Sequence, residues 1–476
     1  MYIYIFSIQG NVIFIVLLQT AHMKIVILGG VAAGAKAAAK SRRLLPDAQI
    51  DIYTDDTHVS YSGCGLPYYI EGNFEDYRML LVRSPEEFEA QGIHVHLQHR
   101  AVKIIPESKQ ALIYNMVEQH SHLIDYDKLI IATGASSVIP PIPNVNLPNV
   151  FTLRKVEDGI AIKEKALRSK NAVIVGGGYI GIELLEALVK QGVNVTLIEY
   201  APHIMPIFDE DMSKLILEQL MHHSNGRYKI LTSEIISEFS GDMTGVHAVR
   251  TTSGLDIPVD FVILCAGAKP NTDIACDAGI TVGLHDSIKV NEHMETSIPD
   301  IYACGDCAEK TLVISGTKIW TPLGSVANKE GRCAAMNACG FDDTFPGVLA
   351  SAVTRCLGLI MSMTGLTEKY AKQQGFNPIS ATVTKYDKVG YMPDVNNITL
   401  KLVADIDSGR LLGAQAIGVG DADKRVNIFA SALLGKLTVE DFLAHDLTYA
   451  PPFSPTIDPL LNAAQILASK IRKAKS

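Results

Sequence analysis

Two stretches of the chain share one pattern of apolar and polar positions: a short run of β-branched and aliphatic residues, a glycine turn, and an alanine- or leucine-rich helix. The first has its apolar run at 24–28 and its helix at 35–44, and the second has them at 172–175 and 182–190. Short unbroken apolar runs that alternate with helices are typical of buried strands in a parallel sheet. The pattern therefore predicts two Rossmann-type β-α-β units, each suited to a dinucleotide.

The glycines of both turns are candidate cofactor ligands, because glycine lets the backbone turn tightly and approach a pyrophosphate at a helix N-terminus. In the second turn they fit G-x-G-x-x-G and are Gly176, Gly178 and Gly181. In the first turn they are Gly29, Gly30 and Gly34, with Val31 at the middle glycine position of the fingerprint.

An acid after the second strand of such a unit binds the adenosine ribose. In the second unit the predicted strand 194–198 leads directly to Glu199. Glu199 repels a 2′-phosphate, and no Arg or Lys near this strand end can receive one, so the sequence favours NADH over NADPH. In the first unit the predicted strand 49–53 leads to Thr54 and Asp55, so the ribose acid is displaced or missing.

Two later strand ends also carry cofactor candidates. They are Thr133 and Gly134 after 130–131, and Gly305 and Asp306 after 301–303, with Gly267 as a further candidate. An aspartate after a glycine at a strand end can bind ribityl or ribose hydroxyls, and a plain turn aspartate is the alternative.

Past residue 345 a mixed pattern replaces the glycine turns. It predicts strands at 380–386, 398–404 and 411–417, followed by helices at 424–434 and 438–443. The expected fold class is therefore α/β, with two Rossmann-like domains and a C-terminal α+β domain.

Composition narrows the partners. The 476 residues suggest about three domains, and the net charge of −9 without a basic run argues against nucleic acid or an anionic membrane as a partner. We therefore expect a small-molecule substrate. The eight cysteines show no framework spacing, which favours a reducing cytosol and a cytoplasmic protein.

Residues 1–22 form an uncharged apolar run directly before the first predicted strand. The run lacks the basic region and the cleavage site of a secretory signal. We expect a dispensable extension, or an upstream start codon chosen in error, rather than part of the fold; a membrane anchor is the alternative.

Cys64 is the candidate redox residue, because no second cysteine lies near it along the segment 60–68. Pro67 suits a first helical turn, which places the sulfur near a helix N-terminus, where the dipole favours the thiolate. A buried structural cysteine is the alternative. Cys304 and Cys307 form a C-x-x-C, yet no second pair with matching spacing exists, so we predict no metal site.

With these motifs, the chain from Met23 onward resembles the flavin-dependent pyridine nucleotide-disulfide oxidoreductases. It is most similar to their single-cysteine branch, which holds coenzyme A disulfide reductases, persulfide reductases, NADH oxidases and NADH peroxidases. The resemblance implies an FAD-binding domain at 23–148 and 270–345, an NAD-binding domain at 149–269, and a dimerisation domain at 346–476. It also implies a homodimer in which each subunit completes its partner's active site.

Within that branch, the peroxidases and oxidases carry a histidine in the first glycine turn, and here Ala32 occupies its position. The resemblance to coenzyme A disulfide reductases rests on Ser60, Cys64 and the run 449–455. It implies that Tyr449 and Tyr391 are catalytic tyrosines donated by the partner subunit; packed interface tyrosines are the alternative.

The helix after the first glycine turn carries Lys36, Lys40 and Arg43 at i, i+4 and i+7, so three cations share one face. The resemblance assigns them to the phosphates of coenzyme A, and a solvated charged face is the alternative. Asn328 is a further substrate candidate. It stands where some relatives have a histidine, and Gly92 and Ile457 stand at or near lysine positions, so substrate identity stays open.

The expected function is electron transfer from NADH through FAD to Cys64, which reduces coenzyme A disulfide, or a coenzyme A persulfide or polysulfide. One alternative is an NADH oxidase that reduces oxygen. Another is a non-catalytic flavoprotein that senses NADH or redox state.

Overall fold

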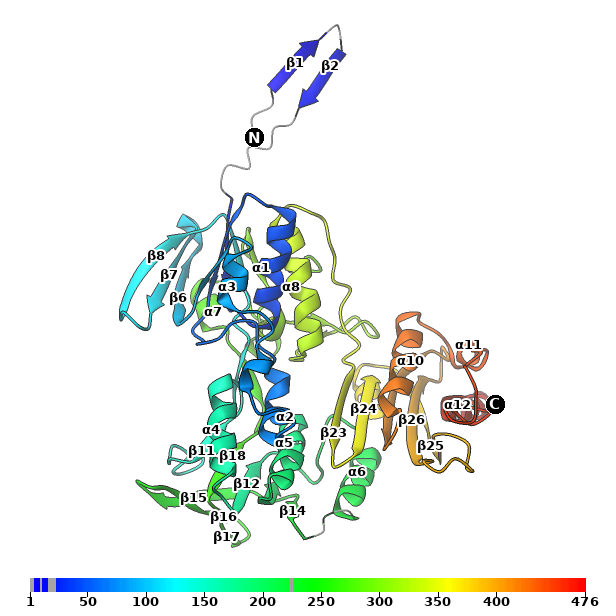
Figure 1. Cartoon of the computed structure of the whole chain (residues 1–476). Helices are drawn as coiled ribbons and strands as arrows, with labels where there is room; N and C mark the ends of the chain where they lie inside the picture. The colour runs from blue at the N-terminus through cyan, green and yellow to red at the C-terminus, as the bar shows by residue number, and fades with distance from the viewer. Residues whose placement is uncertain (1–3, 9–10, 16–22, 223, 225) are drawn as a thin grey trace.

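The computed structural model describes residues 4–8, 11–15, 23–222, 224 and 226–476, and we treat these as the structure of the protein. Three five-stranded sheets carry most of the fold, two of them parallel and one antiparallel. The parallel sheets belong to the N-terminal two thirds of the chain, and the antiparallel sheet lies beside them, at the right of Figure 1.

The first sheet has the strand order β20-β9-β3-β4-β5 and is parallel throughout. Its strands are Ile301–Ala303 (β20), Lys128–Ile131 (β9), Lys24–Leu28 (β3), Gln49–Tyr53 (β4) and Ile93–His96 (β5). Two helices lie side by side on it, α1 (Ala32–Leu44) and α8 (Gly324–Ala338) (Figure 1). The predicted strands 24–28 and 49–53 have the bounds found, and every residue of both except the first is buried, as in a strand covered on both faces.

An antiparallel sheet of β6 (His99–Ile105), β7 (Gln110–Asn115) and β8 (His120–Asp125) adjoins this domain. Shorter elements here are α2 (Leu66–Glu71), α3 (Pro85–Glu89), α7 (Asp273–Asp277), β21 (Lys310–Thr311) and β22 (Lys318–Ile319). Pro67 stands in the first turn of α2, as the sequence predicts.

The second parallel sheet has the order β11-β18-β12-β13-β14. Its strands are Val150–Thr152 (β11), Phe261–Leu264 (β18), Asn171–Val175 (β12), Asn194–Ile198 (β13) and Tyr228–Leu231 (β14). The helices are α4 (Val156–Ala166), α5 (Tyr179–Lys190) and α6 (Glu210–His222). A small sheet of β15 (Ile236–Asp242), β16 (Gly245–Thr251) and β17 (Asp256–Pro258) follows. The chain passes between the two parallel sheets through the antiparallel pair β10 (Ala135–Ser137) and β19 (Ala268–Pro270).

The C-terminal sheet is antiparallel, with the order β23-β24-β27-β26-β25. Its strands are Ala352–Cys356 (β23), Leu359–Gly365 (β24), Leu411–Gly418 (β27), Asn397–Asp405 (β26) and Pro378–Tyr386 (β25). The helices are α9 (Glu368–Gln373), α10 (Ala422–Leu434), α11 (Val439–Leu443) and α12 (Pro459–Lys475). The sequence analysis predicted β25, β26, β27, α10 and α11, but it missed β23, β24 and α12.

Near the N-terminus, β1 (Tyr4–Ile8) and β2 (Asn11–Ile15) pair antiparallel with each other and with no other described strand. The rest of the predicted extension 1–22, including the alternative of a membrane anchor there, lies outside the described residues. Among the helices of the described chain, none combines the length and apolar character that a membrane crossing needs.

Candidate functional site

One large cavity of about 1370 Å³ is bounded by residues from the domains of all three main sheets. It gathers most of the residues that the sequence predicted for FAD, the redox centre and the substrate. They are Gly29, Gly30, Lys36, Arg43, Thr54, Asp55, Ser60, Cys64, Thr133, Gly134, Gly305, Asp306 and Asn328. Ala32 also lines it, as do residues of α5 and α10.

The first glycine turn is closed too tightly for side chains. Gly29 has φ +108°, and a Cβ there would lie 2.1 Å from the backbone oxygen of Ala132. A Cβ on Gly34 would lie 1.9 Å from the oxygen of Gly29, so glycine at both positions lets α1 start directly against the end of β3. The N-terminus of α1 therefore faces the cavity and provides the positive end of a dipole for a pyrophosphate. These residues fit an FAD cofactor.

The second glycine turn has the same construction on β12 and α5. Gly176 has φ +110°, and a Cβ on Gly181 would lie 2.0 Å from its oxygen, while a Cβ on Gly178 would meet open space. Gly178 is thus the point where a ligand can approach the backbone. Gly267 has φ +109° and accepts a backbone hydrogen bond from Val138 at the passage between the two parallel sheets, outside the large cavity.

Glu199 directly follows β13, beside this second turn, and is only 4% exposed. Its carboxylate accepts hydrogen bonds from the backbone amides of Gly177 (2.7 Å) and Ala201 (2.8 Å). The acid is therefore held next to the glycines that the dinucleotide approaches, while Tyr200 is 79% exposed. The structure brings the Glu199 carboxylate to the second glycine turn, and its binding of a ribose stays a prediction.

Three aspartates beside the first sheet form ion pairs with Arg154 and Lys155. Asp306 accepts a hydrogen bond from Arg154 Nη2 at 2.7 Å. At the end of β4, Lys155 Nζ lies 3.5 Å from Asp55 and 2.5 Å from Asp56. Burial raises the pKa of Asp56, and Lys155 opposes that shift. Arg154 and Lys155, which the sequence analysis did not single out, therefore tie the FAD-side acids to the start of the second domain.

Thr133, a predicted cofactor residue, has a local role as well. The Thr133 hydroxyl donates to the backbone oxygen of Asn271 (2.6 Å), so it fixes the turn after β9. Cys304 and Cys307 are buried free thiols behind Asp306, and burial raises the pKa of both. Cys307 Sγ donates to the backbone oxygen of Cys304.

Cys64 lies in a short 3₁₀ turn, Gly63–Gly65, immediately before α2, with its thiol exposed in the cavity. The N-terminus of α8 is also close, since a Cβ on Gly324 would lie 3.8 Å from Cys64 Sγ. The expected thiolate-favouring shift is not found in this chain on its own. The pKa of Cys64 is raised, first because the surrounding protein desolvates the thiol and then because Glu183 and Asp306 are nearby; Arg154 opposes the shift. A helix dipole alone would favour the thiolate, but the fold brings these two carboxylates near Cys64 from distant segments, and they disfavour it.

Two residues on α5 were missed by the sequence analysis, although they stand within the second glycine-helix unit. Tyr179 and Glu183 both line the cavity near Cys64. The buried hydroxyl of Tyr179 has no hydrogen-bond partner among the described residues. Glu183 accepts a hydrogen bond from Thr354 Oγ1 on β23 (3.0 Å), and burial raises its pKa. A periodicity count on 179–190 would have flagged both, because they share one helix face.

The structure brings only part of the predicted cationic face of α1 to the cavity. Lys36 and Arg43 line the cavity, with Ala39 between them, but Lys40 does not. Lys40 lies near the Cys339 thiol instead, so the structure does not bring it to the predicted substrate site. Ser60 has φ +52°, and Asn328 Nδ2 donates to the oxygen of Gly324.

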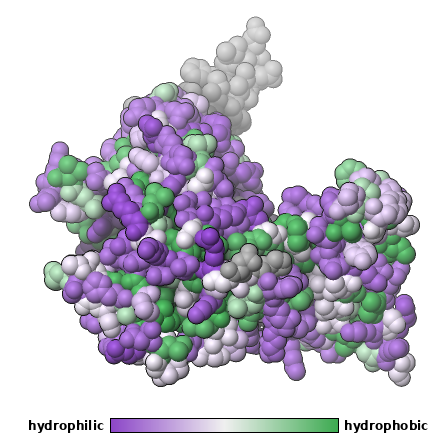
Figure 2. Space-filling model, turned by 60° about the horizontal axis from the view of Figure 1, so that its bottom comes forward, coloured by the Kyte–Doolittle hydropathy of each residue, from purple (hydrophilic) through white to green (hydrophobic). Residues whose placement is uncertain are grey.

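Tyr391 and Tyr449 are 74% and 49% exposed on the C-terminal domain, and neither lines the cavity around Cys64 of the same chain. Other apolar side chains of this domain are exposed as well, among them Val353, Val419 and Phe453. On the face seen in Figure 2, apolar residues are interspersed with hydrophilic ones, including over this domain at the right.

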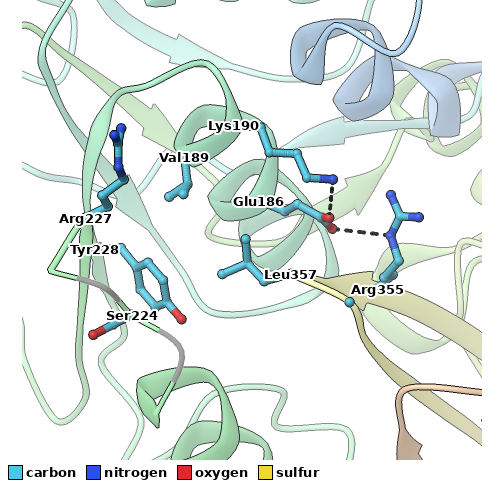
Figure 3. Close-up of a pocket in the computed structure, with 9 residues that line it drawn as sticks. Glu186, Val189, Lys190, Ser224, Arg227, Tyr228, Arg355 and Leu357 are labelled. Atoms are coloured by element: carbon cyan, nitrogen blue, oxygen red, sulfur yellow. Dashed lines mark ion pairs between the residues drawn. The ribbon is translucent and has the colours of Figure 1, made fainter. Parts of the chain in front are cut away.

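A charged cluster fixes the far end of the helix that follows Cys64. Glu186 on α5 pairs with Lys190 (2.6 Å) and with Arg355 on β23 (3.5 Å), as Figure 3 shows beside a smaller cavity of about 440 Å³. The same two cations reach Glu71, the last residue of α2, at 2.6 and 3.7 Å. Three domains therefore meet at α2, whose first turn follows Cys64.

Comparisons with known proteins agree with this architecture. Residues 23–331 match the pyridine nucleotide-disulphide oxidoreductase family model, and residues 357–460 match the dimerisation domain of that family. The NAD(P)H coenzyme A polysulfide/persulfide reductase of Pyrococcus horikoshii is 36% identical over 94% of this chain and 99% of its own length. An NADH oxidase of Methanocaldococcus jannaschii is 32% identical over 94% of this chain and 99% of its own length.

Among solved structures, reduced Bacillus anthracis CoADR-RHD superimposes with a TM-score of 0.91 at 33% identity, over 95% of this chain and 81% of that one. The fold and the cavity define the class: an enzyme with two Rossmann-type units and a large cavity that contains Cys64. The chain belongs to the pyridine nucleotide-disulphide oxidoreductase family. It is accordingly an FAD- and NAD(P)H-dependent oxidoreductase of the group that holds coenzyme A disulfide reductases and NADH oxidases.

Proposed function

We propose that the protein is a cytoplasmic homodimer that uses NADH to reduce coenzyme A disulfide, or a coenzyme A persulfide or polysulfide, at Cys64. The observation that carries this is the position of one cysteine in the large cavity together with the cations Lys36 and Arg43. A sulfur nucleophile and a cationic face in one cavity suit a substrate that combines a disulfide with phosphates. The Pyrococcus horikoshii relative, named as a coenzyme A polysulfide/persulfide reductase, supports the same substrate class.

The proposed chemistry at sulfur is thiol-disulfide exchange. The Cys64 thiolate attacks the outer sulfur of the substrate, the sulfur–sulfur bond breaks, one coenzyme A thiolate leaves, and Cys64 is left in a mixed disulfide. Bound FAD supplies the two-electron relay from NADH that returns Cys64 to a thiolate and releases the second thiol. Tyr449, or in second place Tyr391, from the partner subunit protonates or stabilises the leaving thiolate.

The protein positions the cofactors. Gly29, Gly30 and Gly34 with the α1 N-terminus hold the FAD pyrophosphate, and Asp306 with Thr54 and Asp55 holds its sugar hydroxyls. Gly176, Gly178 and Gly181 hold the pyrophosphate of NADH. Glu199 selects NADH over NADPH, because its buried charge repels a 2′-phosphate.

An NADH oxidase is the second candidate function, and the Methanocaldococcus jannaschii relative named NADH oxidase favours it. In that function Cys64 cycles through a sulfenic acid. Against it stands Ala32, a methyl group on the cavity wall where an acid-base side chain would be needed. A non-catalytic NADH or redox sensor is a third candidate, separated from both by the absence of turnover.

The test is anaerobic NADH oxidation by the purified flavoprotein with coenzyme A disulfide, coenzyme A persulfide or polysulfide, beside an aerobic control without sulfur substrate. We expect rapid turnover with one sulfur substrate, little oxygen uptake, and loss of sulfur reduction in Cys64→Ser. Turnover with oxygen alone would establish the oxidase. Bound flavin without turnover on any acceptor would establish the sensor.

A further inference from the structure

A buried ion pair holds both backbone groups of Gly305. The Gly305 N–H donates to Glu330 Oε2 at 2.8 Å, and the Gly305 carbonyl accepts from Lys310 Nζ at 2.6 Å. Lys310 Nζ lies 3.5 Å from the same Glu330 oxygen, and the two side chains are 1% and 0% exposed. The N–H of Gly305 is thus bound by a carboxylate, and its carbonyl is bound by an ammonium group.

Close helix packing brings Glu330 to this position. A Cβ on Gly331 would lie 2.3 Å from the oxygen of Ala33, so glycine there lets α8 approach the first turn of α1. Gly305 itself has φ +80°, and its Cβ would lie 2.9 Å from Ala33 Cβ. Gly305 therefore lies between α1 and α8 in a conformation that favours glycine. The ion pair fixes the orientation of its two peptide groups.

The residue after Gly305 is Asp306, which lines the large cavity. The oxygen of Asp306 accepts a hydrogen bond from Trp320 Nε1 (2.8 Å), and its carboxylate accepts one from Arg154. Asp306 is thus fixed on its C-terminal side and through its side chain. On its N-terminal side, the two charge-assisted hydrogen bonds at Gly305 are what set its direction.

We propose that Glu330 and Lys310 are positioning residues for FAD: they clamp Gly305 so that the carboxylate of Asp306 is held in the orientation that flavin binding uses. The proposal rests on the proposed function of Asp306 as an FAD ligand. Neither residue lines the cavity, so both act through Gly305. Within the described chain, the buried Glu330 Oε1 has no hydrogen-bond partner, and leaving it unsatisfied costs stability, so a role in the fold alone does not account for Glu330.

The clamp also has a pH-dependent component. Burial raises the pKa of Glu330 to about 7, and Lys310 and the Gly305 amide oppose the shift. The other titratable groups near the pair are Asp306, which raises that pKa further, and the thiols of Cys304, Cys307 and Cys333, all buried. Protonated Glu330 makes a weaker, neutral hydrogen bond to Gly305, so FAD is held less firmly at low pH.

The experiment measures FAD dissociation from the purified holoprotein by flavin fluorescence, beside thermal unfolding, for the wild type, Glu330→Gln and Lys310→Met/Glu330→Gln. Removing both charges of a buried pair is often neutral for stability. We therefore expect the double variant to unfold near the wild-type temperature and to lose FAD about tenfold faster, the effect of one charge-assisted hydrogen bond. The matched control is Asp458→Asn, which removes one charge of the buried Arg425–Asp458 pair in the C-terminal domain. We expect this variant to retain FAD as the wild type does.

The pH series on the wild type keeps the test decisive if a variant does not fold. We expect faster FAD loss at pH 6 than at pH 8, and no such difference in Glu330→Gln. This sign separates the clamp from a fold-stabilising role: a carboxyl with a raised pKa makes the apoprotein more stable, not less, as pH falls through that pKa. FAD retention that is unchanged in the double variant, or independent of pH in the wild type, overturns the proposal. Failure to bind FAD at all would instead refute the proposed function.

Discussion

Lys190 Nζ lies 2.6 Å from Glu71 Oε1 and joins the second glycine-helix unit to the last residue of α2, the helix that begins after Cys64. The side chain of Glu71 is 4% exposed, while that of Lys190 is 43% exposed. The contact therefore buries a carboxylate and leaves the cation partly in water. Its consequence is that α2, which begins just after Cys64, is anchored at its last residue by Lys190 of another domain.

Glu71→Gln is expected to loosen α2. The amide keeps the shape but loses the charge that Lys190 and Arg355 share, and both cations still have Glu186, so the expected loss of stability is modest, about 1–2 kcal/mol. Thermal unfolding of the purified protein gives the change in midpoint, and mass spectrometry of iodoacetamide adducts gives the exposure of Cys64. We expect a lower midpoint and faster alkylation at Cys64.

The matched control is Glu210→Gln, which breaks an exposed i, i+4 pair with Lys214 in which both side chains are 63% exposed. Exposed pairs contribute roughly 0–1 kcal/mol, so we expect little change in either readout. Equal effects of the two variants would show that α2 is not anchored through Glu71.

The raised pKa of Cys64 predicts a steep pH profile. Desolvation, Glu183 and Asp306 disfavour the thiolate, so alkylation of Cys64 in the reduced protein should rise about tenfold per pH unit between pH 7 and 9. Glu183→Gln removes the neighbouring carboxylate that raises the pKa of Cys64 more than Asp306 does, and should shift the profile to lower pH, so that alkylation at a given pH is roughly threefold faster. A profile that is already flat at pH 7 would show that the thiolate is stabilised after all.

Sequence patterns predicted most of what local periodicity determines. The glycine turns, the strands β3, β4 and β13 and the position of Pro67 depend on neighbouring residues, and the structure has them as expected. By contrast, β24 was missed because it is buried on both faces and shows no alternation. β23 was missed because Val353 is exposed and Thr354 is buried, so its apolar residues do not follow its burial. Long-range contacts could not be predicted either. No local pattern shows that Glu183 lies near Cys64, or that Glu330 binds the backbone of Gly305.

Lys40 illustrates the limit of a helical-wheel argument. Its spacing from Lys36 and Arg43 is correct for one broad face, but Lys40 does not line the cavity, whereas Lys36, Ala39 and Arg43 do. The packing of α8 against α1 decides which part of that face is open, and this packing depends on segments almost 300 residues apart.

Nicotinamide cofactor preference should depend on Glu199. Its carboxylate is held by the amides of Gly177 and Ala201 and cannot swing away from a 2′-phosphate. Glu199→Ser with Tyr200→Arg removes the repulsion and adds a cation, so the ratio of kcat/KM for NADH over NADPH should fall at least about tenfold, or 1.4 kcal/mol. Steady-state kinetics with both cofactors gives this ratio. An unchanged ratio in the folded variant would show that other residues of the second domain determine the preference between NADH and NADPH.

The partner-subunit role of Tyr449 can be tested by complementation. Chains carrying Cys64→Ser and chains carrying Tyr449→Phe, marked with different tags, are co-expressed and the mixed dimer is purified. If each site combines Cys64 of one subunit with Tyr449 of its partner, the mixed dimer has one intact site and should show about half the wild-type disulfide reductase activity. If Tyr449 serves its own chain, neither site is intact and the mixed dimer should be no more active than the Tyr449→Phe homodimer. Because Tyr449 is exposed and absent from the cavity around its own Cys64, we expect the first outcome.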